Sequence, residues 1–255
     1  MFRYIDYKLI ITMNQSAILE VQNLTKTFTN AGHSLTVLHG VSFSIEKGIT
    51  CAIVGPSGSG KTTLLGLCAG LDKPTSGSVS LNNQKISDYS EANLSKIRNE
   101  QIGFVFQSFQ LIPTLTALEN VMVPIELRGV PYHKVEKSAL ELLESVGLKN
   151  RAGHYPTQLS GGEQQRVGIA RAFIHQPEIL FADEPTGNLD GETGAQVEEI
   201  LFNLNKEKGT TLIIVTHDIE LASKCDRIIE LKNGHIHKDT YTTATEPEAI
   251  QMDAL

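Results

Sequence analysis

The sequence has little of what several function classes require. Lys and Arg number 22 against 29 Asp and Glu, which gives a formal net charge of -7 with histidine neutral. A general electrostatic grip on nucleic acid needs clustered excess positive charge, so this composition disfavours a DNA- or RNA-binding protein. No apolar run approaches the roughly 18 residues of a membrane-spanning helix, so any association with a membrane must come through a partner.

Cysteines are few, odd in number and widely spaced. Cys51, Cys68 and Cys225 form no C-x-x-C pair of the kind that holds zinc or exchanges disulfides, so we expect reduced structural thiols in a cytosolic protein. Residues 1–16 are expected to be an N-terminal extension. They lack the long apolar centre and the cleavage site of a signal peptide, and a start of translation at Met13 is an alternative.

What the sequence does contain is a phosphate-loop pattern, in which two glycines bracket four residues and precede Lys and a hydroxyl residue. The pattern follows the apolar run 50–54 and precedes a helical run that Gly70 closes, which is the strand, loop and helix order that the motif needs. Backbone N–H groups of such a loop and of the helix start bind phosphate. The predicted nucleotide contacts are Gly55, Pro56, Ser57, Gly58, Ser59, Gly60, Lys61, Thr62 and Thr63, and Thr62 is also expected on a magnesium ion.

Three kinds of pattern follow one another along the chain and predict an α/β fold. Residues 17–48 alternate in the manner of an antiparallel sheet, with strands at 18–21, 35–38 and 41–45. Residues 90–176 are mostly helical, and after them apolar strands alternate with helices, as in a parallel sheet. We therefore expect a mostly parallel core sheet, an antiparallel β subdomain and a helical subdomain at about 90–176. The domain should span 17–238, and 239–255 should be a disordered tail.

Four apolar strands end in polar residues that suit one reaction. The first leads into the phosphate loop, and the other three end at Gln107, at Asp183 and Glu184, and at His217. Because ligands bind beyond the carboxyl ends of parallel strands, we expect these groups to converge. Asp183 suits magnesium, Glu184 an attacking water and Gln107 either of them, while His217 could donate to a γ-phosphate.

A second helix start also suits an anion. Ser160, with Glu163 three residues on, predicts a capping box, and Gly161 and Gly162 stand between them. Glycines weaken a helix by roughly 1 kcal/mol each relative to Ala. They make sense where bare backbone must approach something closely, and a phosphate is one candidate.

Together these motifs resemble the nucleotide-binding subunit of ABC transporters. The resemblance rests on the phosphate loop, a Q-loop at Gln107, the signature 159–166, the Asp183-Glu184 strand end, a D-loop at 188–190 and a switch at His217. Residues 104–120 and 181–190 resemble the lipoprotein-release and macrolide-efflux branch. The family's fold agrees with the fold class predicted above.

The resemblance implies ATP and Mg²⁺ as cofactors and a homodimer that closes head to tail. In such a dimer Ser160, Gly161 and Gly162 of one copy contact the γ-phosphate held by the other, and Asp190 also lies at the nucleotide. By the same resemblance Phe28 is the aromatic residue that stacks on adenine. An integral membrane permease-type subunit is the expected partner, on the cytoplasmic face of the inner membrane, with no nucleic acid. The alternative is a soluble ABC ATPase that acts on nucleic acid or ribosomes.

Overall fold

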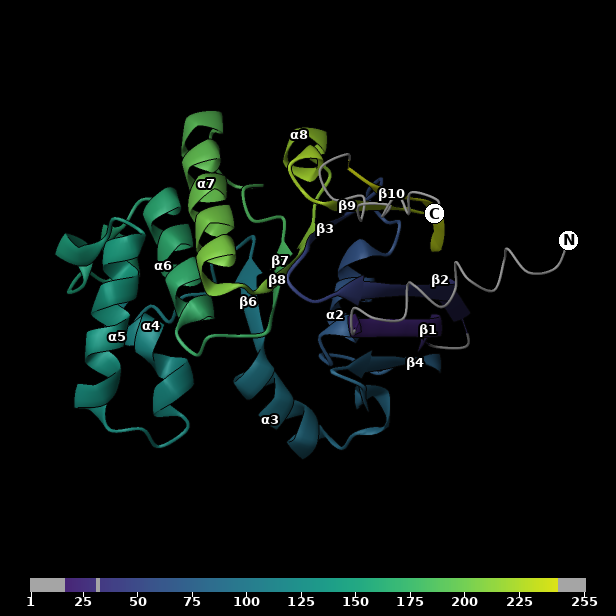
Figure 1. Ribbon diagram of the computed structural model, residues 1–255, viewed down its shortest axis with the longest axis horizontal. Helices are drawn as coiled ribbons and strands as arrows, with labels where there is room; N and C mark the ends of the chain where they lie inside the picture. Colours follow the sequence, from purple (N-terminus) through teal and green to yellow (C-terminus); the bar gives the residue numbers. More distant parts are fainter. Residues whose placement is uncertain (1–16, 31–32, 243–255) are drawn as a thin grey trace, which may run out of the picture.

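The computed structural model describes residues 17–30 and 33–242, so the expected extension at 1–16 lies outside the described residues (Figure 1). The strands and helices in this part of the chain are β1 (Ala17–Asn30), β2 (His33–Glu46), β3 (Thr50–Val54), α2 (Lys61–Cys68), β4 (Ser76–Leu81), β5 (Gln84–Lys85), α3 (Glu91–Gln101), β6 (Ile102–Phe106), α4 (Ala117–Glu126), α5 (Tyr132–Ser145), α6 (Gly161–Phe173), β7 (Ile179–Asp183), α7 (Gly191–Lys208), β8 (Thr211–Val215), α8 (Ile219–Ser223), β9 (Arg227–Lys232) and β10 (His235–Tyr241).

Two sheets form the framework. The larger one has the strand order β10-β9-β3-β8-β7-β6, in which the five strands from β9 to β6 are parallel and β10 pairs antiparallel with β9. The smaller sheet is antiparallel, with the order β2-β1-β4-β5. This arrangement confirms the predicted α/β class with a mostly parallel core sheet and a separate antiparallel sheet.

The parallel strands are apolar throughout because both of their faces are buried. Every residue of β3 and β8 is buried, and their side chains alternate between two cores. Ala52 and Ile214 pack against the helices α4 to α8, whereas Cys51 and Ile213 face the antiparallel sheet and α2. The central sheet thus separates two hydrophobic cores and contributes side chains to both. The register of its parallel strands places their carboxyl ends along one edge.

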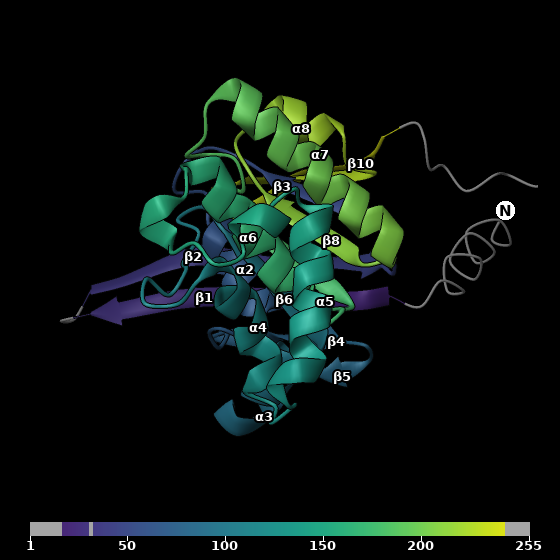
Figure 2. The same ribbon diagram turned by 90° about the vertical axis from the view of Figure 1, so that its left-hand side faces the viewer.

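The helical layer covers the sheet on one side, and Figure 2 shows α4, α5 and α6 from that side. Val135, Ala139 and Leu143 form the buried stripe of α5 at the spacing of an amphipathic helix. Pro124 lies inside the short helix α4. Buried Asn120 accepts from the N–H of Ile112 at 2.7 Å and donates to its carbonyl, so it holds the loop before α4 in place.

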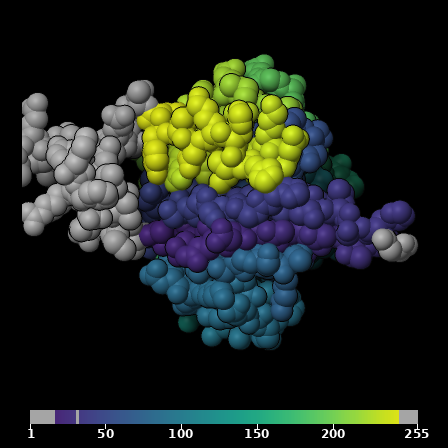
Figure 3. Space-filling view, turned by 90° about the vertical axis from the view of Figure 1, so that its right-hand side faces the viewer, coloured from purple at the N-terminus to yellow at the C-terminus, as the bar shows by residue number. Residues whose placement is uncertain are grey.

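Two boundaries differ from the sequence prediction. The two expected strands at 35–38 and 41–45 are one continuous strand, β2, because bulges in its pairing with β1 accommodate Gly40 at a φ of 65°. The expected boundary at residue 238 falls inside β10, which runs to Tyr241. Its end is held by the guanidinium of Arg227, whose Nη2 donates to Asp239 at 2.7 Å, and Figure 3 shows the β9–β10 hairpin beside the β1–β2 hairpin.

Candidate nucleotide-binding and hydrolysis site

A cleft of about 720 Å³ opens at the carboxyl ends of the parallel strands. Residues from four separate parts of the chain meet there, since β2, the phosphate loop with the start of α2, the end of β7 and the end of β8 all reach it. Its lining residues are Leu35, Val37, Ser57, Gly58, Gly60, Lys61, Thr62, Thr63, Glu184 and His217. The convergence predicted from the strand ends is therefore present for the loop, for Glu184 and for His217.

The phosphate loop is held from behind by the β9–β10 turn. The N–H of Gly234 donates to the carbonyl of Ser59 at 3.2 Å, and the N–H of His39 donates to the carbonyl of Gly234 at 3.0 Å. Gly60 ends the loop at a φ of 99°, a conformation that glycine adopts without strain, and α2 begins at the next residue. The loop is thus fixed between the two sheets with the first turn of α2 facing the cleft.

Lys61 spans the loop from its helical end. Its ammonium donates to the carbonyls of Gly55 and Pro56, at 2.8 and 3.1 Å. An ammonium has three N–H donors, so one remains for a further acceptor. This places a positive charge at the rim of the loop, where a phosphate bound by the backbone would need it.

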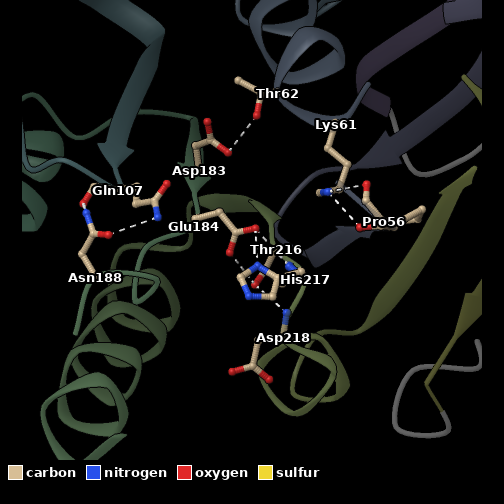
Figure 4. Close-up of polar contacts among 11 residues, drawn as sticks. Pro56, Lys61, Thr62, Gln107, Asp183, Glu184, Asn188, Thr216, His217 and Asp218 are labelled. Carbon is tan, nitrogen blue, oxygen red and sulfur yellow. Dashed lines mark hydrogen bonds and ion pairs between the residues drawn. The ribbon is translucent and has the colours of Figure 1, made fainter. Parts of the chain in front are cut away.

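Glu184 is the most constrained acidic side chain of the site (Figure 4). Its Oε1 accepts from the backbone N–H of His217 at 3.1 Å and lies 2.8 Å from His217 Nδ1, while its Oε2 accepts from the Thr216 hydroxyl at 3.2 Å. The backbone of Glu184 has a φ of 46°, in the left-handed region that few non-glycine residues occupy. Such strain persists only where the surroundings impose it, and here it aims the carboxylate into the cleft.

Asp183 and Thr62 face each other across the end of β7, with Thr62 Oγ1 3.4 Å from Asp183 Oδ1 (Figure 4). Burial raises the pKa of the Asp183 carboxyl, and the neighbouring Glu184 raises it further. A partly buried carboxylate is destabilised as an anion unless a cation or a proton compensates it, and the hydrogen bond from the Thr62 hydroxyl offsets this only in part. The pair therefore has the chemistry of a cation ligand set.

Gln107 follows β6, and the register of the sheet brings it to this edge, because Phe106 pairs with Asp183. Its side chain faces the D-loop: its Nε2 donates to Asn188 Oδ1 at 3.2 Å, and Asn188 Nδ2 donates to the Gln107 carbonyl at 2.9 Å. Gln107 does not line the cleft itself. Asn188 is thus a direct partner of Gln107 that the sequence prediction missed.

The signature segment lies apart from the cleft of its own chain. Ser160 and Glu163 form the predicted capping box at the start of α6, which confirms that prediction. The two hydrogen bonds of the capping box restrain this helix start. The bond from the Ser160 N–H holds the pKa of the Glu163 carboxyl below its usual range. Ser160, Gly161 and Gly162 are absent from the cleft lining, so this helix start faces elsewhere.

The glycines of the signature also have a reason within the fold. A Cβ on Gly162 would lie 2.2 Å from Cγ2 of Thr193 in α7, so no larger residue fits there without movement. A Cβ on Gly161 would meet its nearest neighbour, Leu189, at an ordinary 3.5 Å. Packing within the chain therefore requires glycine at position 162 but not at position 161.

Two further predicted contacts lie at the margins. Phe28 is 45% exposed and pairs with Leu35, but Leu35 and Val37 line the cleft and Phe28 does not. The ammonium of Lys26 sits 4.9 Å from the centre of the Phe28 ring. Asp190 caps α7 by accepting from the N–H of Thr193 at 3.0 Å, and this bond lowers the pKa of its carboxyl.

Besides Asn188, three residues that shape the site were missed by the sequence prediction. Leu35 and Val37 belong to a strand whose alternation reads as ordinary sheet, and nothing local in the sequence marks them as cleft residues. Thr216 is not among the residues predicted for the site. Its position directly before His217 is the one sequence signal of its bond to Glu184.

A parallel sheet with a glycine loop between strand and helix, and acidic groups at the adjacent strand ends, defines a phosphate-loop nucleoside triphosphatase. The family description "ABC transporter" matches residues 38–187 of this chain. The chain belongs to the ABC transporter family, as an ATP-binding and ATP-hydrolysing protein. The alternative of an ATPase acting on nucleic acid is not favoured by these matches.

Characterised and uncharacterised relatives agree on this family. The chain is 52% identical to the uncharacterized ABC transporter ATP-binding protein YbbA of Escherichia coli K12, over 87% of this chain and 97% of that protein. It is 49% identical to the lipoprotein-releasing system ATP-binding protein LolD of Legionella pneumophila strain Lens, over 86% of this chain and 97% of that protein.

Solved structures give the same fold. The dimeric structure of MJ0796, a bacterial ABC transporter cassette, matches with a TM-score of 0.83 and 44% identity over 89% of this chain and all of that one. A second dimeric structure of MJ0796, in a post-hydrolysis state bound to ADP and Pi, matches with a TM-score of 0.82 and 43% identity over the same shares. CbiO1 of Clostridium perfringens, part of the transporter complex cbiONQ, has a TM-score of 0.79 and 31% identity, with 89% of each chain covered.

Among the helices of the described ranges, none is long and apolar enough to cross a membrane. In the same part of the chain no three His, Cys, Asp or Glu side chains gather into a group that could hold a metal ion.

Proposed function

We propose that this chain powers a membrane partner by closing, with ATP, into a head-to-tail dimer of two identical subunits. The observation that carries the proposal is the separation of two anion-binding elements. The phosphate loop shares a cleft with Glu184, whereas the helix start at Ser160 lies outside that cleft. Each element is half of a site, and a second copy related by two-fold symmetry supplies the other half to both.

In the proposed dimer the phosphate loop, residues 55–63, binds the phosphates, and Lys61 directs its remaining N–H to them. Glu184 acts as the general base for the attacking water, because Oε2 accepts only the Thr216 bond and keeps a lone pair for a proton. His217, fixed to Glu184 through Nδ1, can present its other ring nitrogen to the γ-phosphate. Ser160, Gly161 and Gly162 of the second copy close over that phosphate, with Asp190 at the dimer contact.

The base of the nucleotide has two apolar side chains available on β2. Leu35 and Val37 line the cleft, and Phe28 lies directly opposite Leu35 on the same sheet face. We assign Phe28 as the stacking aromatic beside this pair. Closure over adenine would then bury an aromatic ring that is now 45% exposed.

The residues present fit magnesium. Thr62 and Asp183 offer a hydroxyl and a partly buried carboxylate 3.4 Å apart, and Gln107 offers an amide oxygen at the same sheet edge. Mg²⁺ would supply charge neutralisation on the β- and γ-phosphates. Burial raises the pKa of the Asp183 carboxyl, so a cation would relieve an unfavourable charge there.

The relatives support a membrane partner, and we propose that it docks on the helical subdomain, which we place at about residues 90–176 of a domain that begins at residue 17. CbiO1 is part of a multisubunit transporter complex, and LolD is the ATP-binding protein of a lipoprotein-releasing system. We assign this chain to the cytoplasmic face of the inner membrane, held by a permease-type subunit. The process that it powers is export, extraction of lipids or lipoproteins, or mechanical work in the envelope.

Complementation between two inactive variants tests the shared site. Lys61→Ala damages a chain's own phosphate loop, and Ser160→Arg damages the half that it offers to a partner. In a one-to-one mixture half of the dimers are mixed, and each has one site with both halves intact. ATP hydrolysis should recover to about a quarter of the wild-type rate. Activity no greater than the sum of the two separate variants would contradict head-to-tail sharing.

The membrane partner is tested by purification from detergent-solubilised membranes with ATP and the Glu184→Gln variant, which should hold the closed state. A stoichiometric integral membrane protein is the expected companion. Recovery of RNA or DNA in its place would support the nucleic-acid alternative. The wild-type chain without nucleotide is the control for non-specific capture.

A further inference from the structure

Two hydrogen bonds join Gln107 and Asn188, and one of their atoms determines which way both side-chain amides are turned. The Gln107 backbone carbonyl can only accept a hydrogen bond, so the Asn188 atom that faces it at 2.9 Å is the amide nitrogen. The oxygen of the Asn188 amide is then left on its other side. It accepts from Nε2 of the Gln107 side chain at 3.2 Å.

These two hydrogen bonds determine which end of the Gln107 side-chain amide is free to bind a ligand. Since Nε2 is turned to Asn188, the amide oxygen of Gln107 points away from it (Figure 4). Metal ions and the protons of a water bind amide oxygen and not amide nitrogen. A Gln107 amide rotated by half a turn would present two N–H donors to the same space and could not act as a ligand.

The surroundings leave room for this arrangement. A Cβ on Gly187 would lie 2.9 Å from Gln107 Nε2, so the bare backbone at Gly187 lets the side chain lie against the D-loop. The N–H of Gly187 donates to the carbonyl of Glu184 at 3.1 Å, which ties the D-loop to the strand end that carries the acidic pair. Asn188 is therefore positioned by the same turn that positions Glu184.

We propose that Asn188 is a positioning residue that sets the orientation of the Gln107 amide, so that the oxygen and not the nitrogen faces the metal and the attacking water. The inference rests on the metal-ligand role proposed for Gln107. Asn188 acts through Gln107 and need not touch the nucleotide. Its contribution appears only in the part of nucleotide affinity that depends on the metal.

The test measures binding of a fluorescent, non-hydrolysable ATP analogue at protein concentrations where light scattering shows monomers. For each variant the dissociation constant with EDTA is divided by that with Mg²⁺, and this ratio is the magnesium benefit. Loss of one oriented, exposed hydrogen bond should lower the magnesium benefit of Asn188→Ala about two- to fivefold. Affinity in EDTA should not change. Asn93→Ala, an exposed position in α3, is the matched control and should change neither value.

The decisive comparison repeats Asn188→Ala in a Gln107→Glu chain. The carboxylate of Gln107→Glu has two equivalent oxygens, so Asn188 has no orientation to set. The Asn188 Oδ1 would also repel the carboxylate oxygen that faces it. In this background Asn188→Ala should leave the magnesium benefit unchanged or raise it. A structural role for Asn188 would instead lower the benefit in both backgrounds, and that result would overturn the inference.

Gln107→Ala separates this inference from the proposed function. If Gln107→Ala lowers the magnesium benefit and Asn188→Ala does not, the positioning role is wrong and the ligand role of Gln107 stands. If Gln107→Ala leaves the magnesium benefit at the wild-type value, Gln107 is not a ligand, and both assignments are wrong. Circular dichroism of each variant confirms that the comparison is between folded proteins.

Discussion

Gly162 and Gly161 offer a matched pair in which a methyl group has opposite consequences. In Gly162→Ala the new Cβ would lie 2.2 Å from Cγ2 of Thr193, far inside van der Waals contact. Overpacking of this kind costs about 1–3 kcal/mol, and Thr193 is β-branched and has few rotamers with which to yield. Replacing Gly by Ala inside a helix returns about 1 kcal/mol. The net effect should be a loss of stability of about 0–2 kcal/mol.

Thermal unfolding measures this loss directly. For a chain of this size 1 kcal/mol corresponds to roughly 2–4 °C, so Gly162→Ala should lower the melting temperature by up to about 8 °C. Thr193→Ser removes the interfering methyl and keeps the hydroxyl. In that background the same Gly162→Ala change should be neutral or stabilising.

Gly161→Ala is the control, since its Cβ would meet Leu189 at 3.5 Å. It should not lower the melting temperature, yet it should slow ATP hydrolysis if bare backbone is needed to approach the partner's nucleotide. Equal destabilisation by Gly162→Ala with and without the Thr193 methyl would refute the steric argument. It would leave the close packing of α6 on α7 without an energetic role.

The chemistry of the site gives four further predictions. Lys61→Ala removes a charged phosphate contact and should weaken ATP binding about 10- to 100-fold in equilibrium titration, and unchanged affinity would count against the loop assignment. Glu184→Gln should retain ATP binding but lower steady-state hydrolysis at least about 100-fold, and a normal rate would exclude the general-base role. Asp183 has a raised pKa through burial, so the nucleotide-free protein should lose stability as pH rises from the ordinary value of 3.8 through the raised pKa. Asp183→Asn should abolish that loss in pH-dependent melting and also abolish stabilisation by Mg²⁺ with ATP, and a retained magnesium effect would contradict its role as ligand. Ser160→Arg should bind ATP as a monomer with wild-type affinity but fail to hydrolyse it, as single-turnover assays would show.

The motifs were predictable because their chemistry is local. A glycine loop between strand and helix, and acidic residues at a strand end, carry their function in consecutive residues, and the parallel sheet aligns the strand ends by its register. The capping box at Ser160 was predictable for the same reason. These features need no knowledge of contacts between distant segments.

The missed features depend on distant contacts. Leu35 reaches the cleft only because β2 crosses beside the phosphate loop, and Asn188 meets Gln107 although 81 positions separate them. The expected break in β2 was wrong because a glycine in a strand signals either a turn or a bulge, and only the pairing with β1 decides between them. The predicted domain end at residue 238 is too early, because Asp239 binds Arg227 across the β9–β10 hairpin. The amino-acid composition of the tail does not indicate this contact.

The central claim is that ATP joins two half-sites, and the mass of the Glu184→Gln variant in solution tests it most directly. Light scattering with Mg²⁺ and ATP should show a change from one chain of 27.9 kDa to two, reversed by ADP. The same variant carrying Ser160→Arg should remain a single chain while still binding ATP. A Glu184→Gln protein that is saturated with ATP and stays monomeric, or a dimer that forms equally well with Ser160→Arg, would contradict the account.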